Sequence, residues 1–252
     1  MARRQLIAGN WKMFKTVSEA VSFVTELRDA VASIKDCDFA VAPPYLAIHA
    51  VAQKLAGSNI GVSAQEMFYE DQGAFTGCIS GPMIKEAGCT YTLIAHSERR
   101  QYFGETNESS NKRLQATLRA GLVPILCVGE TLEQREAGKT NEIVKKQLEG
   151  ALAGFAVADL AKLIIAYEPV WAIGTGKVAT PIQAQEAHAF IRSLLRTKDT
   201  AWADTVRILY GGSVKPDNAA ELLGQPDIDG GLVGGASLKV DSFVGIAKGR
   251  KS

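Results

Sequence analysis

The stretch Ile164–Lys177, which reads IIAYEPVWAIGTGK, decides how the rest of the chain is interpreted. It begins inside an apolar run, Leu163–Tyr167, that has the length of one buried strand in a parallel sheet. Glu168 follows where such a strand would leave the sheet, and Pro169 ends strand pairing because it fixes φ and lacks an N–H donor. The sequence therefore predicts a carboxylate held at the rigid end of a strand.

The second half of the same stretch has the composition of a loop that closes over a ligand. Val170–Ile173 is apolar, and Gly174–Gly176 reads Gly-Thr-Gly. Apolar side chains in a loop are costly unless they are covered, and glycines let the backbone approach a ligand closely. We therefore predict an acid or base at Glu168 with a lid beside it. The alternative is an ordinary strand–loop–helix connection with a solvated glutamate.

Short apolar runs alternate with helix-periodic segments along the whole chain. The predicted strands are Leu6–Asn10, Asp38–Ala42, Ile60–Ala64, Tyr91–Ala95, Val123–Val128, Leu163–Tyr167, Val206–Tyr210 and Gly231–Val233. Helices are expected from Thr16, over Leu46–Leu55, around Pro82–Ala87, over Glu105–Ala120 and Asn141–Leu152, from Thr180 to about Lys198, after Pro216, and over Asp241–Lys248. Eight such units predict an α/β fold, a parallel eight-stranded (β/α)8 barrel with outer helices, formed by one domain over residues 1–252. An open, doubly wound sheet is the alternative.

The bulk composition is that of a soluble cytoplasmic protein. The chain has 252 residues, of which 46% are hydrophobic, and a formal net charge of +1 from 28 basic and 27 acidic residues. With no basic stripe, a nucleic-acid partner is not expected. No apolar segment is long enough to span a membrane, and Leu6–Ala8 is too short for the core of a signal peptide. The four cysteines have neither C-x-x-C spacing nor a nearby histidine pair, which is typical of reduced thiols.

Polar residues follow the ends of several predicted strands, and these ends share one face of a parallel barrel. Glu168 is the candidate base for a proton on carbon next to a carbonyl. His96 is the candidate electrophile, although a lone histidine at a strand end is often only a structural hydrogen-bonding group. Lys12 could stabilise an enediolate and attract phosphate, could form a Schiff base, or could be a surface lysine. Asn10 could orient Lys12 or polarise the substrate.

Two glycine clusters could supply backbone donors to a phosphate. Gly211-Gly212-Ser213 follows the seventh predicted strand, and Gly234-Gly235 follows the eighth, where barrels commonly bind phosphate. Gly174 in the loop could add a third donor. The chain has no G-x-G-x-x-G motif after a strand, no Walker motif and no cluster of metal ligands, so we expect neither cofactor nor metal.

Five segments together resemble the triosephosphate isomerase family, in the right order from end to end. They are AYEPVWAIGTGK, GNWKM at Gly9–Met13, AHSERR at Ala95–Arg100, YGGSV at Tyr210–Val214 and GLVGGASL at Gly231–Leu238. The resemblance implies a (β/α)8 barrel that interconverts dihydroxyacetone phosphate and D-glyceraldehyde 3-phosphate through an enediolate, in glycolysis and gluconeogenesis, without cofactor or metal. It implies Glu168 as proton acceptor and His96 as electrophile, with Asn10 and Lys12 binding substrate. The resemblance also assigns phosphate contacts and supporting roles: Gly174, Ser213, Gly234 and Gly235 hold phosphate, and Ser97, Glu98 and Cys127 support the site.

The sequence departs from the family at two positions near the site. Ala95 stands where the family usually has glycine, and Phe14 stands where asparagine is frequent. Neither position carries a reacting group, so the assignment is kept. Two alternatives remain, a Schiff-base aldolase that uses Lys12 and a sugar-phosphate-binding barrel without catalysis.

The longest predicted connection, Gln65–Gly77, indicates an assembly of two chains. It carries four large apolar side chains, which would be a liability if they were exposed: Met67, Phe68, Tyr69 and Phe75. We expect a homodimer in which this loop, with Thr76 near its tip, reaches the partner near Asn10 and Lys12, as the resemblance also implies. The alternative is a loop that folds back on its own barrel.

Overall fold

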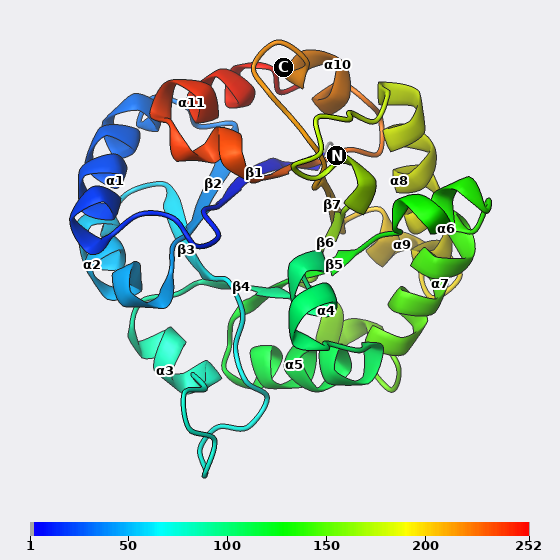
Figure 1. Ribbon diagram of the computed structural model, residues 1–252, viewed down its shortest axis with the longest axis horizontal. Coiled ribbons are helices and arrows are strands. Elements are labelled where there is room, and N and C mark those ends of the chain that lie inside the picture. The colour runs from blue at the N-terminus through cyan, green and yellow to red at the C-terminus, as the bar shows by residue number, and fades with distance from the viewer. Residues whose placement is uncertain (1–2, 252) are drawn as a thin grey trace.

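A computed structural model describes residues 3–251 and contains a closed barrel of eight parallel strands (Figure 1). The strands are β1 (Gln5–Asn10), β2 (Cys37–Ala42), β3 (Ile60–Ala64), β4 (Tyr91–Ile94), β5 (Val123–Val128), β6 (Ile164–Tyr167), β7 (Arg207–Tyr210) and β8 (Gly230–Val233). Each strand pairs with the next in the chain, and β1 pairs with β8 over Leu6–Gly9 and Gly230–Val233. The predicted barrel is therefore confirmed, and the open sheet is wrong. The expected domain also includes residues 1, 2 and 252, which lie outside the described residues.

The helices form a ring around the strands (Figure 1). They are α1 (Val17–Val31), α2 (Tyr45–Leu55), α3 (Gly81–Glu86), α4 (Ser97–Phe103), α5 (Asn107–Arg119), α6 (Leu132–Glu136), α7 (Thr140–Ala151), α8 (Pro181–Arg196), α9 (Thr200–Ala203), α10 (Ala219–Leu223) and α11 (Val240–Lys248), with 3-10 turns at Val157–Leu160, Val170–Ala172 and Gly235–Leu238. Within residues 3–251, none of these helices has the length and apolar character needed to cross a membrane.

Side-chain alternation along the strands builds two separate apolar layers. Leu6 and Ala8 of β1 point into the barrel, where they pack with residues such as Ile164 and Leu209. Ile7, between them, belongs to the larger cluster that lies between the barrel and the helices. Because successive side chains of a strand point to opposite faces, one short strand contributes to both cores. This two-sided burial fixes the strand ends that carry the polar residues.

Local sequence signals set most helix starts, and the errors concern one cap that was overlooked and helices too short to show a period. Thr16 and Thr180 form the predicted capping boxes, each bonding reciprocally with the residue three positions later. The predicted helix Glu105–Ala120 begins instead at Asn107, because Thr106 is its cap. Short helices α4, α6 and α9 were not predicted, since one or two turns present too few apolar residues to show a period.

The long connection Gln65–Gly77 is partly anchored on its own barrel and partly projecting. Met67 is fully buried within its own chain, and its sulfur accepts the Thr117 hydroxyl at 3.6 Å. Its expected place in an interface with a partner is therefore wrong, and for this residue the alternative, folding back on its own barrel, holds. Phe68 stacks on Tyr69 at 4.2 Å and contacts Phe75 at 4.6 Å between ring centroids. The rest of the loop extends away from the barrel beside α3 (Figure 1).

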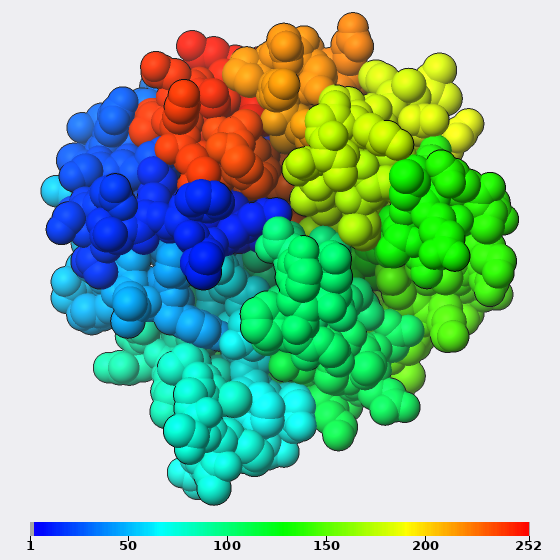
Figure 2. Space-filling view, in the orientation of Figure 1, coloured from blue at the N-terminus to red at the C-terminus, as the bar shows by residue number. Residues whose placement is uncertain are grey.

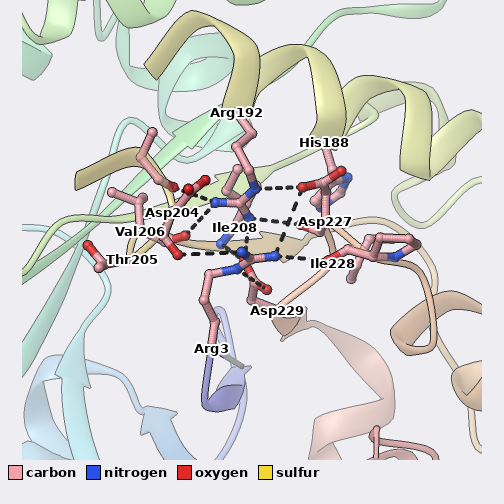
Figure 3. A network of polar contacts seen from close by, with 12 residues as sticks. Arg3, His188, Arg192, Asp204, Thr205, Val206, Ile208, Asp227, Ile228 and Asp229 are labelled. Carbon is pink, nitrogen blue, oxygen red and sulfur yellow. Dashed lines mark hydrogen bonds and ion pairs between the residues drawn. The ribbon is translucent and has the colours of Figure 1, made fainter. Parts of the chain in front are cut away.

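A charged network ties the amino-terminal ends of β1, β7 and β8 together (Figure 3). The Arg192 guanidinium, almost fully buried, contacts Asp227 at 2.6 Å and Asp229 at 2.7 Å. It also donates to the carbonyls of Ala203 and Val206. Burial opposes ionisation of Asp227, but Gln185, Arg192 and Arg3 outweigh it and lower the pKa of this carboxyl. The network joins α8 to the closing strands at the end of the barrel opposite their carboxyl ends.

Replacing Arg192 with methionine should destabilise the fold strongly, because it removes one of the two cations, Arg192 and Arg3, that contact the buried carboxylate of Asp229. It also takes away the donor to the carbonyls of two further residues. Breaking a buried ion pair from one side costs about 3–5 kcal/mol. The matched control is Arg196→Met, since Arg196 pairs with Asp204 and both side chains are about half exposed. That change should cost no more than about 1 kcal/mol. Denaturant unfolding of both variants measures the difference, and equal losses would contradict it.

Candidate active site

All eight predicted site residues line one cavity of about 360 Å³ at the carboxyl ends of the strands. They are Asn10, Lys12, His96, Glu168, Gly174, Ser213, Gly234 and Gly235. Figure 2 shows the segments that follow β1 (blue), β4 (green), β6 (yellow-green) and β8 (orange-red) meeting at the centre of this face. Residues more than 200 positions apart in the sequence are thus brought to one pocket by closure of the barrel.

The Glu168 carboxylate is buried and held by two donors from the segment after β4. Its Oε1 lies 2.8 Å from His96 Nε2, and its Oε2 accepts the Ser97 backbone N–H at 2.8 Å. The Glu168 backbone N–H donates to the Val128 carbonyl at 2.7 Å, so strand pairing with β5 continues to this residue. Both carboxylate oxygens are therefore oriented before any ligand enters.

His96 is the N-cap of α4, and this position determines which ring nitrogen faces the pocket. Nδ1 accepts the Glu98 backbone N–H at 3.3 Å, so in the neutral ring the hydrogen lies on Nε2 and points toward Glu168. Burial disfavours the charged imidazole, but the Glu168 charge and hydrogen bond, together with Glu98, outweigh burial and raise the pKa of His96. The ring thus presents a hydrogen-bond donor to the cavity.

Lys12 has a strained backbone that its neighbours hold in place. Its φ is +51°, a left-handed value that is uncommon for a residue with a side chain. Asn10 Oδ1 accepts the Lys12 N–H at 3.0 Å, and Gln65 Nε2 donates to the Lys12 carbonyl at 2.8 Å. The Lys12 ammonium lies 2.6 Å from Glu98 Oε1. Asn10 therefore orients Lys12 through the backbone, one of the two roles considered for it.

Ala95 also has a left-handed backbone, with φ of +59° immediately before His96. Such a conformation costs an alanine about 1–2 kcal/mol relative to a right-handed one. It ends β4 at Ile94, one residue before the predicted end. Arg100 Nε donates to the Ala95 carbonyl at 3.1 Å and holds this turn. Glycine adopts the same φ without strain, which accounts physically for the glycine that the resemblance leads one to expect here.

The loop after Glu168 is fixed at its base and exposed at its tip. Trp171 Nε1 donates to Glu130 Oε1 at 3.0 Å, and Tyr167 donates its hydroxyl to the same carboxylate. The Ser213 N–H donates to the Ala172 carbonyl at 3.1 Å, linking the loop to the segment after β7. Gly174 and Gly176 have φ of +67° and +79°, values that favour glycine.

A second, larger cavity of about 520 Å³ lies on the other side of Glu168. Apart from Glu168 it shares none of the eight residues that line the first cavity. Its walls include Ser97, which was expected to support the site, together with Gln134 and Gln147. Cys127 is also buried, and burial, together with the charge of Glu168, raises the pKa of its thiol well above the usual range. The thiol is therefore a neutral neighbour of the carboxylate.

Sequence reasoning missed two groups that organise the site. Gln65 was assigned only to a long connection, yet it donates to the carbonyls of Lys12 and Ala42. Glu130, fully buried between Tyr167, Trp171 and Arg135, was not considered at all. A carboxylate two residues past an apolar strand, as at Glu130, is the signal that could have identified it.

Comparison with known proteins agrees with this geometry. Residues 5–250 match the family model described as triosephosphate isomerase. The chain is 56% identical over 242 residues to triosephosphate isomerase of Geobacter metallireducens, covering 96% of each chain. It is also 56% identical over 252 residues to that of Magnetococcus marinus, covering 98% of each. A crystal structure of triosephosphate isomerase from Bartonella henselae superposes with a TM-score of 0.89 at 38% identity, covering 98% of both chains. The chain belongs to the triosephosphate isomerase family.

Proposed function

We propose that Glu168, His96 and Lys12 catalyse the interconversion of dihydroxyacetone phosphate and D-glyceraldehyde 3-phosphate, the reaction of the family to which the chain belongs. The observation that carries this assignment is the contact between His96 Nε2 and Glu168 Oε1, 2.8 Å, in the cavity that also contains Lys12. A carboxylate, a hydrogen-bond donor and a fixed cation within one pocket are the groups that proton transfer next to a carbonyl requires.

The reaction needs one base that acts twice. Glu168 removes a proton from the carbon next to the carbonyl, the C–H electrons form a carbon–carbon double bond, and the carbonyl oxygen takes the negative charge. His96 donates to that oxygen from Nε2, and the Lys12 ammonium stabilises the enediolate. The hydroxyl proton on the first carbon passes to the former carbonyl oxygen, a transfer that His96 can mediate. Glu168 then returns its proton to the former carbonyl carbon while the first carbon forms the new carbonyl, so no cofactor takes part. Substrate entry must separate Glu168 from His96, since the two side chains contact each other in this structure.

Lys12 is better suited to electrostatic stabilisation than to a Schiff base. Its ammonium pairs with the Glu98 carboxylate at 2.6 Å, and formation of a Schiff base would break this ion pair. A Schiff base needs the neutral amine as nucleophile. We therefore keep the isomerase as the proposal and leave the aldolase aside.

We assign the phosphate to the segments after β6, β7 and β8. Gly174, Ser213, Gly234 and Gly235 line the cavity, and a glycine has no side chain of its own to keep a ligand from its backbone N–H. Gly235–Leu238 forms one 3-10 turn, whose first N–H groups lack partners within the turn and can bind an anion. Closure of the loop would then add the Gly174 N–H and exclude water.

We further propose that two copies of the chain assemble around the Gln65–Gly77 loop. Apolar side chains gather on this side of the molecule with large exposed fractions: Met13 is 94% exposed, Leu46 89%, Tyr102 68% and Phe103 65%. A cavity of about 220 Å³ with Met13 and Phe103 in its wall extends to Asn10 and Lys12, and a partner's loop tip could enter there. The cytoplasmic location and the lack of a nucleic-acid partner stay predictions.

Replacing Glu168 with glutamine should lower kcat at least about 10²–10⁴-fold, because the amide keeps the shape and loses the proton acceptor. Binding of an unreactive substrate analogue should persist, as calorimetry would measure. The control is Glu149→Gln, since Glu149 is an exposed residue of α7 that pairs only with Lys145. A Glu168→Gln variant with nearly normal kcat would contradict the assignment of Glu168 as the base.

Deleting Ile173–Gly176 should lower kcat and also release inorganic phosphate and methylglyoxal during turnover. An enediolate can eliminate phosphate from the neighbouring carbon when the C–O bond to phosphate aligns with the π orbitals of the double bond, or when the intermediate escapes into water. The closed loop prevents both. A coupled assay with a colorimetric phosphate measurement gives both quantities, with the intact chain as control. If the deletion only weakens binding, and no phosphate appears, the loop is merely a connection.

Replacing Phe75 with aspartate should separate the dimer and lower kcat, because a charge is placed on the projecting loop. Sedimentation should give about twice the chain mass of 26.9 kDa for the unmodified protein and a single-chain mass for the variant. Ile182→Asp is the control, since Ile182 is exposed on α8, away from this loop. A fully active single chain at micromolar concentration would refute the assembly.

A further inference from the structure

Beyond the ends of β5 and β6, the backbone of residues 128–130 stays paired with that of residues 168–170. The Glu168 N–H donates to the Val128 carbonyl at 2.7 Å, and the Val170 N–H donates to the Glu130 carbonyl at 3.1 Å. Gly129 lies between these two hydrogen bonds, directly beside Glu168. The position of the Glu168 backbone therefore depends on where the segment around Gly129 is held.

Gly129 and Glu168 touch backbone to backbone. A Cβ at position 129 would lie 1.8 Å from the Glu168 carbonyl oxygen and 2.6 Å from its carbonyl carbon, far inside van der Waals contact. Only glycine fits there, and no flexible side chain separates the two segments. A displacement of Gly129 is thus passed to Glu168 without being absorbed.

The side-chain amide of Gln147 holds Gly129 by both of its polar backbone groups. Gln147 Oε1 accepts the Gly129 N–H at 2.7 Å, and Gln147 Nε2 donates to the Gly129 carbonyl at 3.0 Å. Gln147 lies on α7, a twelve-residue helix whose apolar face is buried through Val144, Leu148 and Ala151. The amide therefore extends from a rigid support, and we call this pair of hydrogen bonds the Gln147–Gly129 clamp.

We propose that Gln147 is a positioning residue for the base: the clamp fixes Gly129, and Gly129 fixes the backbone from which the Glu168 carboxylate reaches the substrate. The inference rests on the proposed role of Glu168. Gln147 touches neither substrate nor carboxylate, and it acts only through the loop after β5. Proton transfer depends steeply on the distance between base and carbon, so a shift of a fraction of an ångström in Glu168 lowers kcat.

The same loop also carries Glu130, which accepts the Trp171 indole N–H at the base of the lid. Loss of the clamp could therefore act through the lid instead of the base. The two routes differ in what they change. A misplaced base slows proton transfer while the intermediate stays protected, whereas a disturbed lid lets the intermediate lose phosphate.

The test compares Gln147→Met with Gln134→Met. Methionine keeps the length and volume of glutamine and removes both hydrogen bonds to Gly129. Gln134 lines the same cavity, but its amide bonds the Thr131 N–H at 2.9 Å in the cap of α6 and contacts neither Gly129 nor Glu168. We expect kcat of Gln147→Met to fall about tenfold with KM nearly unchanged, because the two backbone hydrogen bonds beside Glu168 remain. Gln134→Met should stay within about twofold of the unmodified protein.

Two further measurements separate positioning from a structural or lid effect. The primary deuterium isotope effect on kcat, with substrate labelled at the reacting carbon, should rise in Gln147→Met, since proton transfer becomes slower relative to the other steps. Inorganic phosphate released per turnover should equal that of the unmodified protein. If Gln147→Met does not fold, Gln147→Glu keeps the acceptor for the Gly129 N–H, loses the donor, and should show the same rise in isotope effect.

An unchanged kcat in folded Gln147→Met overturns the clamp, as does an equal loss in Gln134→Met. An unchanged isotope effect, or a loss accompanied by released phosphate, overturns it in favour of a structural or lid role. Glu168→Gln separates these results from failure of the proposed function. If that variant keeps its activity, the base assignment fails; if it is inactive while Gln147→Met is normal, only the clamp fails.

Discussion

The parallel pairing of β1 with β8 is the constraint on which the site depends. It closes the sheet, so that Leu6–Gly9 lie beside Gly230–Val233 and no strand has a free edge. The parallel direction of the strands places all their carboxyl ends on one face, and closure brings Asn10 from the first strand beside Gly234 after the last. In an open sheet these two residues would lie at opposite edges. The pocket therefore exists because the barrel is closed.

Much of the fold was predictable because its signals are local and repeated. Eight apolar runs gave strands within a residue or two of those observed, and capping threonines such as Thr16 and Thr180 gave helix starts. The errors fall where an element is too short to show a period, or where tertiary contacts determine which side chains are buried. Helix α4 is short and polar, so its sequence has no period to detect, and Met67 is buried in the core, where its sulfur accepts the hydroxyl of Thr117 on α5. The contact between Met67 and Thr117 cannot be predicted from neighbouring residues in the sequence.

The candidate site likewise contains residues that the sequence identifies and residues that only the structure identifies. The residues proposed to carry the chemistry follow strand ends within conspicuous motifs, and all eight line one cavity. Residues that hold them in place carry no such mark, because they act across the barrel from elements distant in sequence. Gln65 supports Lys12 from 53 positions away, and Gln147 holds Gly129, beside Glu168, from 18. A glutamine in a loop or a helix has many ordinary uses, so only coordinates reveal these pairings.

Backbone strain lies at the carboxyl ends of the strands, and the Arg192 network lies at the opposite end of the barrel. Within residues 3–251, the non-glycine residues with left-handed φ are Lys12, Lys15 and Ala95, all after the carboxyl ends of β1 and β4. Two of them adjoin or carry proposed catalytic groups, and hydrogen bonds from Asn10, Gln65 and Arg100 hold them there. Strain of about 1–2 kcal/mol per residue persists only where the surrounding structure is rigid. Arg192 and its two aspartates supply part of that rigidity at the other end of the strands, where no catalytic demand limits how tightly charges pair.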